Sequence, residues 1–334
     1  MEEQNDAAIE YFDLPHFTFR DGSTLNQARL AYKQYNRYAT NIAVIPTCFR
    51  GRINSTFTFA QGILRDYRVI VVALFGNGES SSPSNTVDFP QNIDYHDCVR
   101  AQHQLLTQGL GLSSIDIMVG FSMGGQTTYH WLALYPGMVR KAVIICSSAR
   151  TSRHNHQFLE GPKAALESSI DYTPARKEPG RKEAHRGIRA FGKAYSAWLT
   201  SSSWFEEEMY QKIGYQTLAD WDCDVTGVNY TGWDPDDLLT MLRMWQRGDL
   251  SSCSSDRDES LELTLSRVAV PVLLLPCETD QYFNCRASEK EADWLPNGQC
   301  KIIPSVWGHL AGSGASVEDI KWIDGQIKEF LKKA

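Results

Sequence analysis

Four strand-length runs of this chain are almost continuously apolar, and they constrain its fold more than any other feature. They lie at 42–47, 67–75, 140–147 and 270–277, and Val, Ile, Leu and Ala fill their centres. Runs without polar alternation are typical of strands that are buried on both faces, and such strands belong to parallel sheets covered by helices. Helical patterns alternate with the strand-like runs, which predicts an α/β fold.

Four further segments complete the expected sheet of eight strands. Segments 16–21 and 28–36 alternate between apolar and polar residues, as in an antiparallel pair with one solvated face. Segments 115–121 and 299–304 are the other two expected strands. We therefore expect a mostly parallel eight-stranded sheet with helices on both faces.

The character of the sequence changes between residues 149 and 268. Strand-like runs stop there, tryptophan becomes frequent and helical spacing dominates. We therefore expect a core domain formed by residues 1–148 and 269–334, with residues 149–268 inserted as a helical lid.

Composition and charge argue against several classes of partner. The chain has 33 Lys and Arg residues against 40 Asp and Glu residues, a formal net charge of −7, and no basic stripe, so no nucleic-acid partner is expected. The apolar runs are too short to span a membrane and the acidic N-terminus does not resemble a signal peptide, so we expect a cytoplasmic protein without a membrane partner. The eight cysteines contain no C-x-x-C pair, which favours reduced thiols over a metal site or a disulfide framework.

The segment Gly120-Phe-Ser-Met-Gly124 carries the clearest chemical signal. This G-x-S-x-G pattern follows an expected strand and precedes a helical pattern that stops before Pro136. By itself the pattern also occurs in ordinary glycine-bordered turns, but a serine between a strand and a helix is typical of a nucleophile elbow. The glycines let the strand and the helix approach closely, and the turn raises the hydroxyl at a helix N-terminus, where an oxyanion is favoured. We therefore predict Ser122 as a nucleophile.

A serine hydroxyl needs a base, and the base needs an orienting acid. After a nucleophile elbow these partners follow in the order acid, then histidine. Asp280 and His309 each follow one of the last two expected strands. Glu278 is the alternative acid, but Asp280 lies further into its loop and could reach the histidine, although it could also be a plain solvated acid. We predict a triad of Ser122, His309 and Asp280.

Seven other histidines compete for the role of base. Three lie in helical patterns, three in the insertion and one on an early strand: His96, His103 and His130; His154, His156 and His185; and His16. His309 differs from all of them, because it follows the last expected strand and has Gly308 and Gly312 beside it.

An oxyanion hole needs two backbone N–H groups. Met123, directly after the nucleophile, would supply the first. The loop after the strand at 42–47 would supply the second from Cys48 or Phe49, and we favour Phe49. Cys48 as a second nucleophile is disfavoured because no base is specified for it.

With these motifs in place, the chain resembles the α/β-hydrolases of the homoserine O-acetyltransferase-like family, and particularly their shorter hydrolase relatives. The resemblance extends over most of the chain and includes the elbow and several other segments: Leu30-Ala-Tyr, Asp88-Phe-Pro, Val99-Arg-Ala-Gln-His, Ser148-Ala-Arg-Thr-Ser, Trp233-Asp-Pro-Asp-Asp and Trp307-Gly-His-Leu-Ala-Gly. It implies the α/β-hydrolase fold, the same triad, and a helical lid through which two copies could form a homodimer.

One position departs from the acyltransferases of that family. Those enzymes carry an aspartate directly after the catalytic histidine, where it holds the acceptor's amino group, whereas this chain has Leu310. An apolar side chain cannot pair with an ammonium group, so homoserine is not expected as the acceptor. The family's lid arginine for the acceptor's carboxylate has no clear counterpart, with Arg186 and Arg189 as candidates.

Three functions are consistent with the sequence, each with a small-molecule partner. The leading hypothesis is a serine hydrolase that cleaves an ester, thioester or lactone through an acyl-enzyme. The second is transfer of the acyl group to a hydroxyl or amine other than homoserine's, with acyl-CoA as a co-substrate; neither reaction needs a cofactor. The third is a non-catalytic ligand-binding protein, which would have no need of all three triad residues.

Overall fold

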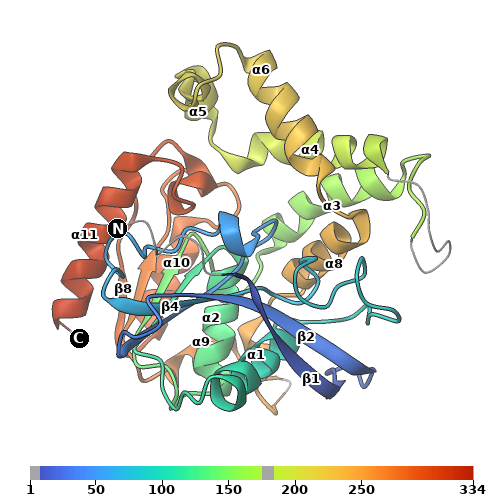
Figure 1. The fold of residues 1–334 in the computed structure, drawn as a ribbon. Coiled ribbons are helices and arrows are strands. Elements are labelled where there is room, and N and C mark those ends of the chain that lie inside the picture. The colour runs from blue at the N-terminus through green and yellow to red at the C-terminus, as the bar shows by residue number, and fades with distance from the viewer. Residues whose placement is uncertain (1–7, 175–183, 257, 334) are drawn as a thin grey trace.

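An eight-stranded sheet forms the centre of the computed structural model, which describes residues 8–174, 184–256 and 258–333 (Figure 1). In chain order the strands are β1 (Glu10–Thr18), β2 (Thr24–Tyr35), β3 (Asn41–Pro46), β4 (Tyr67–Val72), β5 (Ile117–Phe121), β6 (Ala142–Ile145), β7 (Val272–Leu275) and β8 (Gly298–Cys300). Their order in the sheet is β1-β2-β4-β3-β5-β6-β7-β8. The pairs β1–β2 and β2–β4 are antiparallel and all other pairs are parallel, which confirms the predicted fold class.

Both faces of the sheet are buried, as the apolar runs predict. Along β6, Ala142 and Ile144 belong to one apolar core, while Val143 and Ile145 belong to the other. The first core includes residues of α1 (Tyr95–Gln104) and α2 (Met123–Leu134), and the second includes residues of α11 (Val317–Lys333). Strands covered by helices on both sides have no solvated face, which explains their lack of alternation.

The first strand differs most from its expected position. It spans Glu10–Thr18 rather than 16–21, and it pairs with β2 through Leu14 opposite Ala28 and Phe17 opposite Leu25. Because Leu14 and Phe17 are three residues apart and both are buried, the strand has no regular alternation to detect. The last strand is also shorter than expected, and beyond it Ile303 forms only an isolated bridge with Cys277.

The chain between β6 and β7 contributes a run of helices, some of which stand away from the sheet in Figure 1. They are α3 (Arg153–Glu167), α4 (His185–Leu199), α5 (Ser202–Glu206), α6 (Leu218–Asp222), α7 (Asn229–Thr231), α8 (Pro235–Gln246) and α9 (Leu261–Ser266), and α10 (Cys285–Trp294) follows β7. This run occupies the segment predicted as a lid, whose bounds at 149 and 268 stay a prediction, and residues 175–183 lie outside the described part. The side chain of Gln281 donates to the carbonyls of Ala197 and Thr200, so the end of α4 is tied to the loop after β7.

None of the eight cysteines forms a disulfide bond in the structure. In the described part of the chain, no helix combines the length and the apolar character needed to cross a bilayer. Within the same residues, no group of three or more His, Cys, Asp or Glu side chains is arranged to hold a metal ion.

Candidate active site

Ser122 lies on the sharp turn between β5 and α2, with φ 56° and ψ −125°. A positive φ is uncommon for a residue with a side chain and persists only where the surroundings enforce it. Here the N–H of Ser122 donates to the carbonyl of Ile145 over 3.0 Å, and the Ser147 hydroxyl donates to the carbonyl of Ser122 over 2.7 Å. These bonds fix both sides of the turn, so the hydroxyl direction is set by the backbone.

The glycines of the motif are needed for close approach of the strand and the helix. A Cβ atom on Gly120 would lie 2.3 Å from the carbonyl oxygen of Gly124, and one on Gly124 would lie 2.6 Å from the carbonyl oxygen of Pro46. Both distances are shorter than any real contact, and in both cases the obstructing atom is backbone, which cannot move aside. The spacing G-x-S-x-G therefore has a steric cause in this fold.

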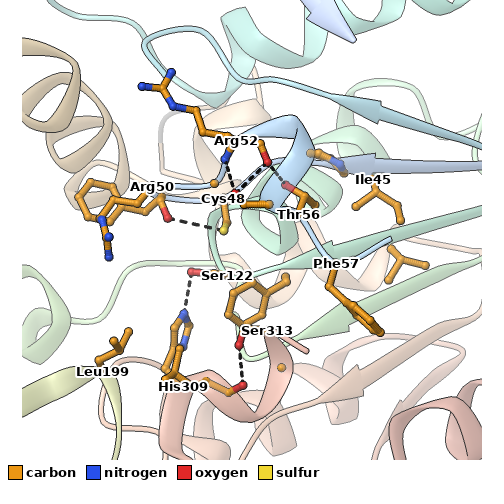
Figure 2. Close-up of a pocket in the computed structure, with 18 of the residues that line it drawn as sticks. Ile45, Cys48, Arg50, Arg52, Thr56, Phe57, Ser122, Leu199, His309 and Ser313 are labelled. Carbon is orange, nitrogen blue, oxygen red and sulfur yellow. Dashed lines mark hydrogen bonds between the residues drawn. The ribbon is translucent and has the colours of Figure 1, made fainter. Parts of the chain in front are cut away.

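A continuous chain of hydrogen bonds connects the three predicted triad residues. His309 Nε2 lies 2.9 Å from Ser122 Oγ, a contact visible in Figure 2, and His309 Nδ1 lies 2.8 Å from Asp280 Oδ2. The carboxylate can only accept, so Nδ1 carries the proton and Nε2 is free to accept the serine hydroxyl proton. The structure thus brings together three residues that lie up to 187 positions apart in the sequence.

Asp280, rather than Glu278, contacts the histidine. The side chain of Asp280 is fully buried, and its Oδ1 accepts the N–H groups of Tyr282 at 2.7 Å and Phe283 at 3.2 Å. These two bonds leave Oδ2 directed at His309. Glu278 is exposed to solvent, two residues earlier in the same loop.

Aromatic rings enclose the base. The ring of His309 lies 4.6 Å from that of Tyr282, 4.8 Å from that of Phe121 and 5.6 Å from that of Phe283, measured between ring centroids. Only 5% of the His309 side chain is exposed. Apolar walls exclude water and so strengthen the electrostatic interaction between the imidazole and Asp280.

The two predicted oxyanion donors come from different parts of the chain. Met123 is the first residue of α2, and Phe49 follows β3 and lines the same cavity as Ser122. Among the hydrogen bonds of the described residues, neither N–H group has a protein acceptor. Two unoccupied donors are what an oxyanion hole requires.

Cys48 shares this loop but is not suited to act as a nucleophile. Its Sγ contacts the carbonyl of Phe49 at 3.6 Å, and burial raises the pKa of the thiol to about 12. A thiol with such a pKa stays protonated near neutral pH, and the thiolate is the reactive form. This agrees with the sequence analysis, in which Cys48 is disfavoured as a second nucleophile.

Several residues that position the site were not found from the sequence. The Thr279 hydroxyl donates to the carbonyl of Ser305 at 2.6 Å and accepts the N–H of Gly308 at 3.1 Å, so it ties the loop of the acid to the loop of the histidine. On the other side, Glu79 accepts the N–H of Ile53 at 2.9 Å and thereby holds the loop that follows Phe49. No motif marks these residues, because each acts through a contact between distant loops.

A cavity of about 360 Å³ opens onto Ser122 and His309. Its walls come from β3 and the loop after it, from β5, from the lid and from the loop of the histidine: Ile45, Pro46, Cys48, Phe49, Arg50, Gly51, Arg52, Ser55, Thr56, Phe57, Phe59, Val119, Phe121, Tyr195, Leu199, Asn229, Trp233, Leu310, Gly312 and Ser313. Leu310, the residue that departs from the acyltransferase pattern, is in this wall. Arg186 and Arg189 are exposed on α4 and are not part of it, so neither is placed to hold a substrate here.

A second buried acid lies behind the elbow. Glu291 accepts the N–H of Ala149 at 2.8 Å and the Tyr129 hydroxyl at 2.6 Å, and burial raises the pKa of this carboxyl to about 7. A raised pKa means that the folded state holds the proton more tightly than the unfolded state does. The stabilising effect of that proton is therefore complete below about pH 4.5 and is lost as the pH rises to about 7.

Replacing Glu291 with glutamine should remove this pH dependence. Glutamine keeps an acceptor for the N–H of Ala149, replaces the acceptor facing Tyr129 with an amide N–H that the Tyr129 oxygen can accept, and cannot ionise. Relative to the wild type, the free energy of unfolding of Glu291→Gln should gain about 1.4 kcal/mol per pH unit between about pH 4.5 and 7, as measured by urea titration. Glu289→Gln, an exposed position on the same helix, is the matched control and should show no such gain. An equal pH dependence in the wild type and Glu291→Gln would contradict the assignment.

Comparison with known proteins agrees with this geometry. The model of the alpha/beta hydrolase fold family matches residues 44–312. An ethyl acetate hydrolase of Pseudomonas veronii is 28% identical, covering 98% of this chain and 97% of that protein. A homoserine O-acetyltransferase of Chlorobium chlorochromatii is 22% identical, covering 93% of this chain and 92% of that protein. These relatives confirm the resemblance to the homoserine O-acetyltransferase-like hydrolases.

A solved structure has a similar fold. An acetylester hydrolase from Corynebacterium glutamicum superposes with a TM-score of 0.90 at 25% identity, covering 98% of this chain and 96% of that one. The family match extends from β3 to the loop of the histidine and so includes Ser122, Asp280 and His309. The chain therefore belongs to the alpha/beta hydrolase fold family.

Proposed function

We propose that this protein is a serine esterase that cleaves small acyl esters through an acyl-enzyme on Ser122. The observation that carries the proposal is the hydrogen-bonded chain from Asp280 through His309 to Ser122, which ends inside a cavity. A serine held in this way has a base to remove its proton and an acid to orient that base.

The reaction then proceeds in two halves. In the first, Ser122 Oγ attacks the ester carbonyl carbon while His309 Nε2 takes its proton, and the N–H groups of Met123 and Phe49 hold the resulting oxyanion. The imidazolium gives its proton to the leaving alcohol as the carbon–oxygen bond breaks. In the second half, His309 takes a proton from water as the water attacks the acyl-enzyme. The imidazolium returns this proton to Ser122 Oγ as the acyl–oxygen bond breaks and the carboxylic acid is released.

The relatives support acetate esters as the first substrates to test. Both the Pseudomonas veronii relative and the Corynebacterium glutamicum structure are named for hydrolysis of acetyl esters. Both are similar to this chain over nearly its full length, and the second shares its fold closely. We infer that a short acyl group occupies the cavity next to Ser122.

Acyl transfer is the second candidate, supported by the homoserine O-acetyltransferase relatives. Transfer differs from hydrolysis only in the group that attacks the acyl-enzyme. Leu310 lines the cavity where those enzymes require an ammonium partner, so homoserine would not be held as the acceptor. We therefore expect water to be the ordinary acceptor.

The test combines turnover with covalent labelling. Wild-type protein should release 4-nitrophenol from 4-nitrophenyl acetate, and a fluorophosphonate should add once to the intact mass, on the peptide that contains Ser122. Acetyl-CoA should be a poor donor, and added homoserine should not accelerate its consumption. Acceleration by an amine or alcohol would favour transfer instead. Ligand binding without turnover or labelling would contradict the esterase and favour a receptor.

A further inference from the structure

The charge in the active-site cavity has one sign. Two arginines, Arg50 and Arg52, line the cavity, and no Asp or Glu is among the described residues of its wall. The chain as a whole has a formal net charge of −7, so this local excess of positive charge is opposite to the overall balance. A cavity lined with one sign of charge concentrates ligands of the other sign.

Arg52 is already engaged by the protein. Its Nη1 donates to the carbonyl of Asn77, and its guanidinium lies 3.9 Å from the centre of the Trp233 ring. Burial raises the pKa values of the nearby acids Glu79 and Asp237, and the charge of Arg52 offsets part of this rise. In Figure 2 the end of its side chain points away from Ser122. Arg52 therefore holds the neighbouring loop together.

Arg50 is held in place but not neutralised. Its guanidinium lies 3.7 Å from the centre of the Tyr230 ring, and its Nη2 donates to the carbonyl of Asn229 at 3.2 Å, so the lid fixes its position. Its Nε is buried without a hydrogen-bond partner, and no carboxylate of the described residues lies within 4.0 Å. A partly buried guanidinium without an anion is costly, and its best partner is a planar carboxylate.

The other end of the cavity is apolar. In Figure 2 the apolar side chains of Ile45 and Phe57 lie there, and the cavity wall also contains Phe59, Val119 and Phe121. In Figure 2, Arg50 and Phe57 lie on opposite sides of Ser122. A substrate that spans the nucleophile would therefore place an apolar group at one end and an anionic group at the other.

We propose that Arg50 binds a carboxylate of the substrate, so that the preferred substrates are esters carrying one acidic group. The inference rests on the proposed esterase function and deepens it. The carboxylate could belong to the acyl part of the ester or to the leaving alcohol. Both present the same chemistry to the guanidinium, and the experiment separates them.

The experiment compares charged and neutral esters of similar size. For the acyl side, the pair is mono-4-nitrophenyl glutarate and 4-nitrophenyl butyrate; for the alcohol side, it is 4-acetoxybenzoate and 4-acetoxybenzamide. In one of the two pairs, wild-type protein should turn over the anionic ester with a kcat/KM at least about 10-fold higher than that of its neutral match. Arg50→Gln should remove this advantage, mainly by raising KM for the anionic ester. The kcat/KM for the neutral ester should stay within about 3-fold of the wild-type value.

Two further variants separate specificity from structure. Arg50→Lys keeps the charge without the planar donor pair, so it should retain part of the preference. Arg140→Gln also removes one positive charge, at a position where 64% of the side chain is exposed, and it should leave kcat/KM for both esters unchanged. If Arg50→Gln lowered kcat/KM equally for the anionic and the neutral ester, Arg50 would have a structural role and the inference would be overturned.

Failure of the inference and failure of the esterase proposal give different results. If wild type hydrolyses the neutral esters and prefers neither anionic ester, the carboxylate site is wrong and the esterase stands. If wild type hydrolyses none of the four esters and is not labelled at Ser122, the esterase proposal itself fails.

Discussion

Replacing Ser122 with alanine should lower kcat/KM for 4-nitrophenyl acetate by about 10⁴- to 10⁶-fold, because the variant has no nucleophile to form the acyl-enzyme. Steady-state release of 4-nitrophenol measures the loss, with protein concentration high enough to detect the residual rate. Fluorophosphonate labelling should disappear in the same variant. Alanine retains the Cβ atom, so the backbone strain at φ 56° is unchanged and the fold should be preserved.

Ser313→Ala is the matched control, since Ser313 is another serine in the wall of the same cavity. Its hydroxyl donates to the carbonyl of Leu310 at 2.7 Å and makes no contact with the triad. Activity should stay within about 3-fold of wild type. A Ser122→Ala variant that kept more than about 1% of the activity would contradict the acyl-enzyme and would require direct attack on the ester by a water molecule that His309 deprotonates.

The elbow could be predicted from the sequence because its constraints are local. Gly120 and Gly124 are separated from Ser122 by one residue each, and the strand and helix patterns on either side are continuous. The steric reason for Gly120 lies within these elements, because the backbone of Gly124 obstructs any side chain at position 120, whereas Gly124 is obstructed by the carbonyl of Pro46 on β3. Local causes of this kind leave a pattern that a single sequence can show.

Spacing in the sequence favours Asp280 over Glu278 as the acid of the triad but does not decide between them. Glu278 and Asp280 differ by two positions, and either could follow the end of the strand. What decides between them is the turn in which the N–H of Asp280 donates to the carbonyl of Cys277 and its Oδ1 accepts two further N–H groups. No residue pattern in the sequence predicts that turn.

Arg50 could not be identified from the sequence at all. Its position depends on Asn229 and Tyr230 of the lid, and Asn229 lies 179 residues further along the chain. The resemblance to the acyltransferases instead offered Arg186 and Arg189 as candidates, and both of these are exposed. Which side chains of a helical insertion face a cavity depends on how the insertion folds back onto the core, and that is a tertiary property.

Replacing Asp280 with asparagine should lower kcat by about 10⁴-fold, and the hydrogen bonds around the residue explain why. The N–H groups of Tyr282 and Phe283 need an acceptor, so the amide oxygen should keep the place of Oδ1. The amide nitrogen then faces His309 Nδ1 and donates to it. This forces the imidazole proton onto Nε2, which can no longer accept the proton of Ser122.

Glu278→Gln tests whether the effect comes from orientation or from charge. Both substitutions remove one negative charge and introduce one amide in the same loop, but Glu278 is exposed and does not contact the imidazole. Its kcat should stay within about 3-fold of wild type. Comparable losses in the two variants would mean that the loop supplies only negative charge, and a larger loss in Glu278→Gln would identify Glu278 as the acid. A large loss in Asp280→Asn alone, with the free energy of unfolding preserved, would isolate the contribution of holding the imidazole in its catalytic tautomer.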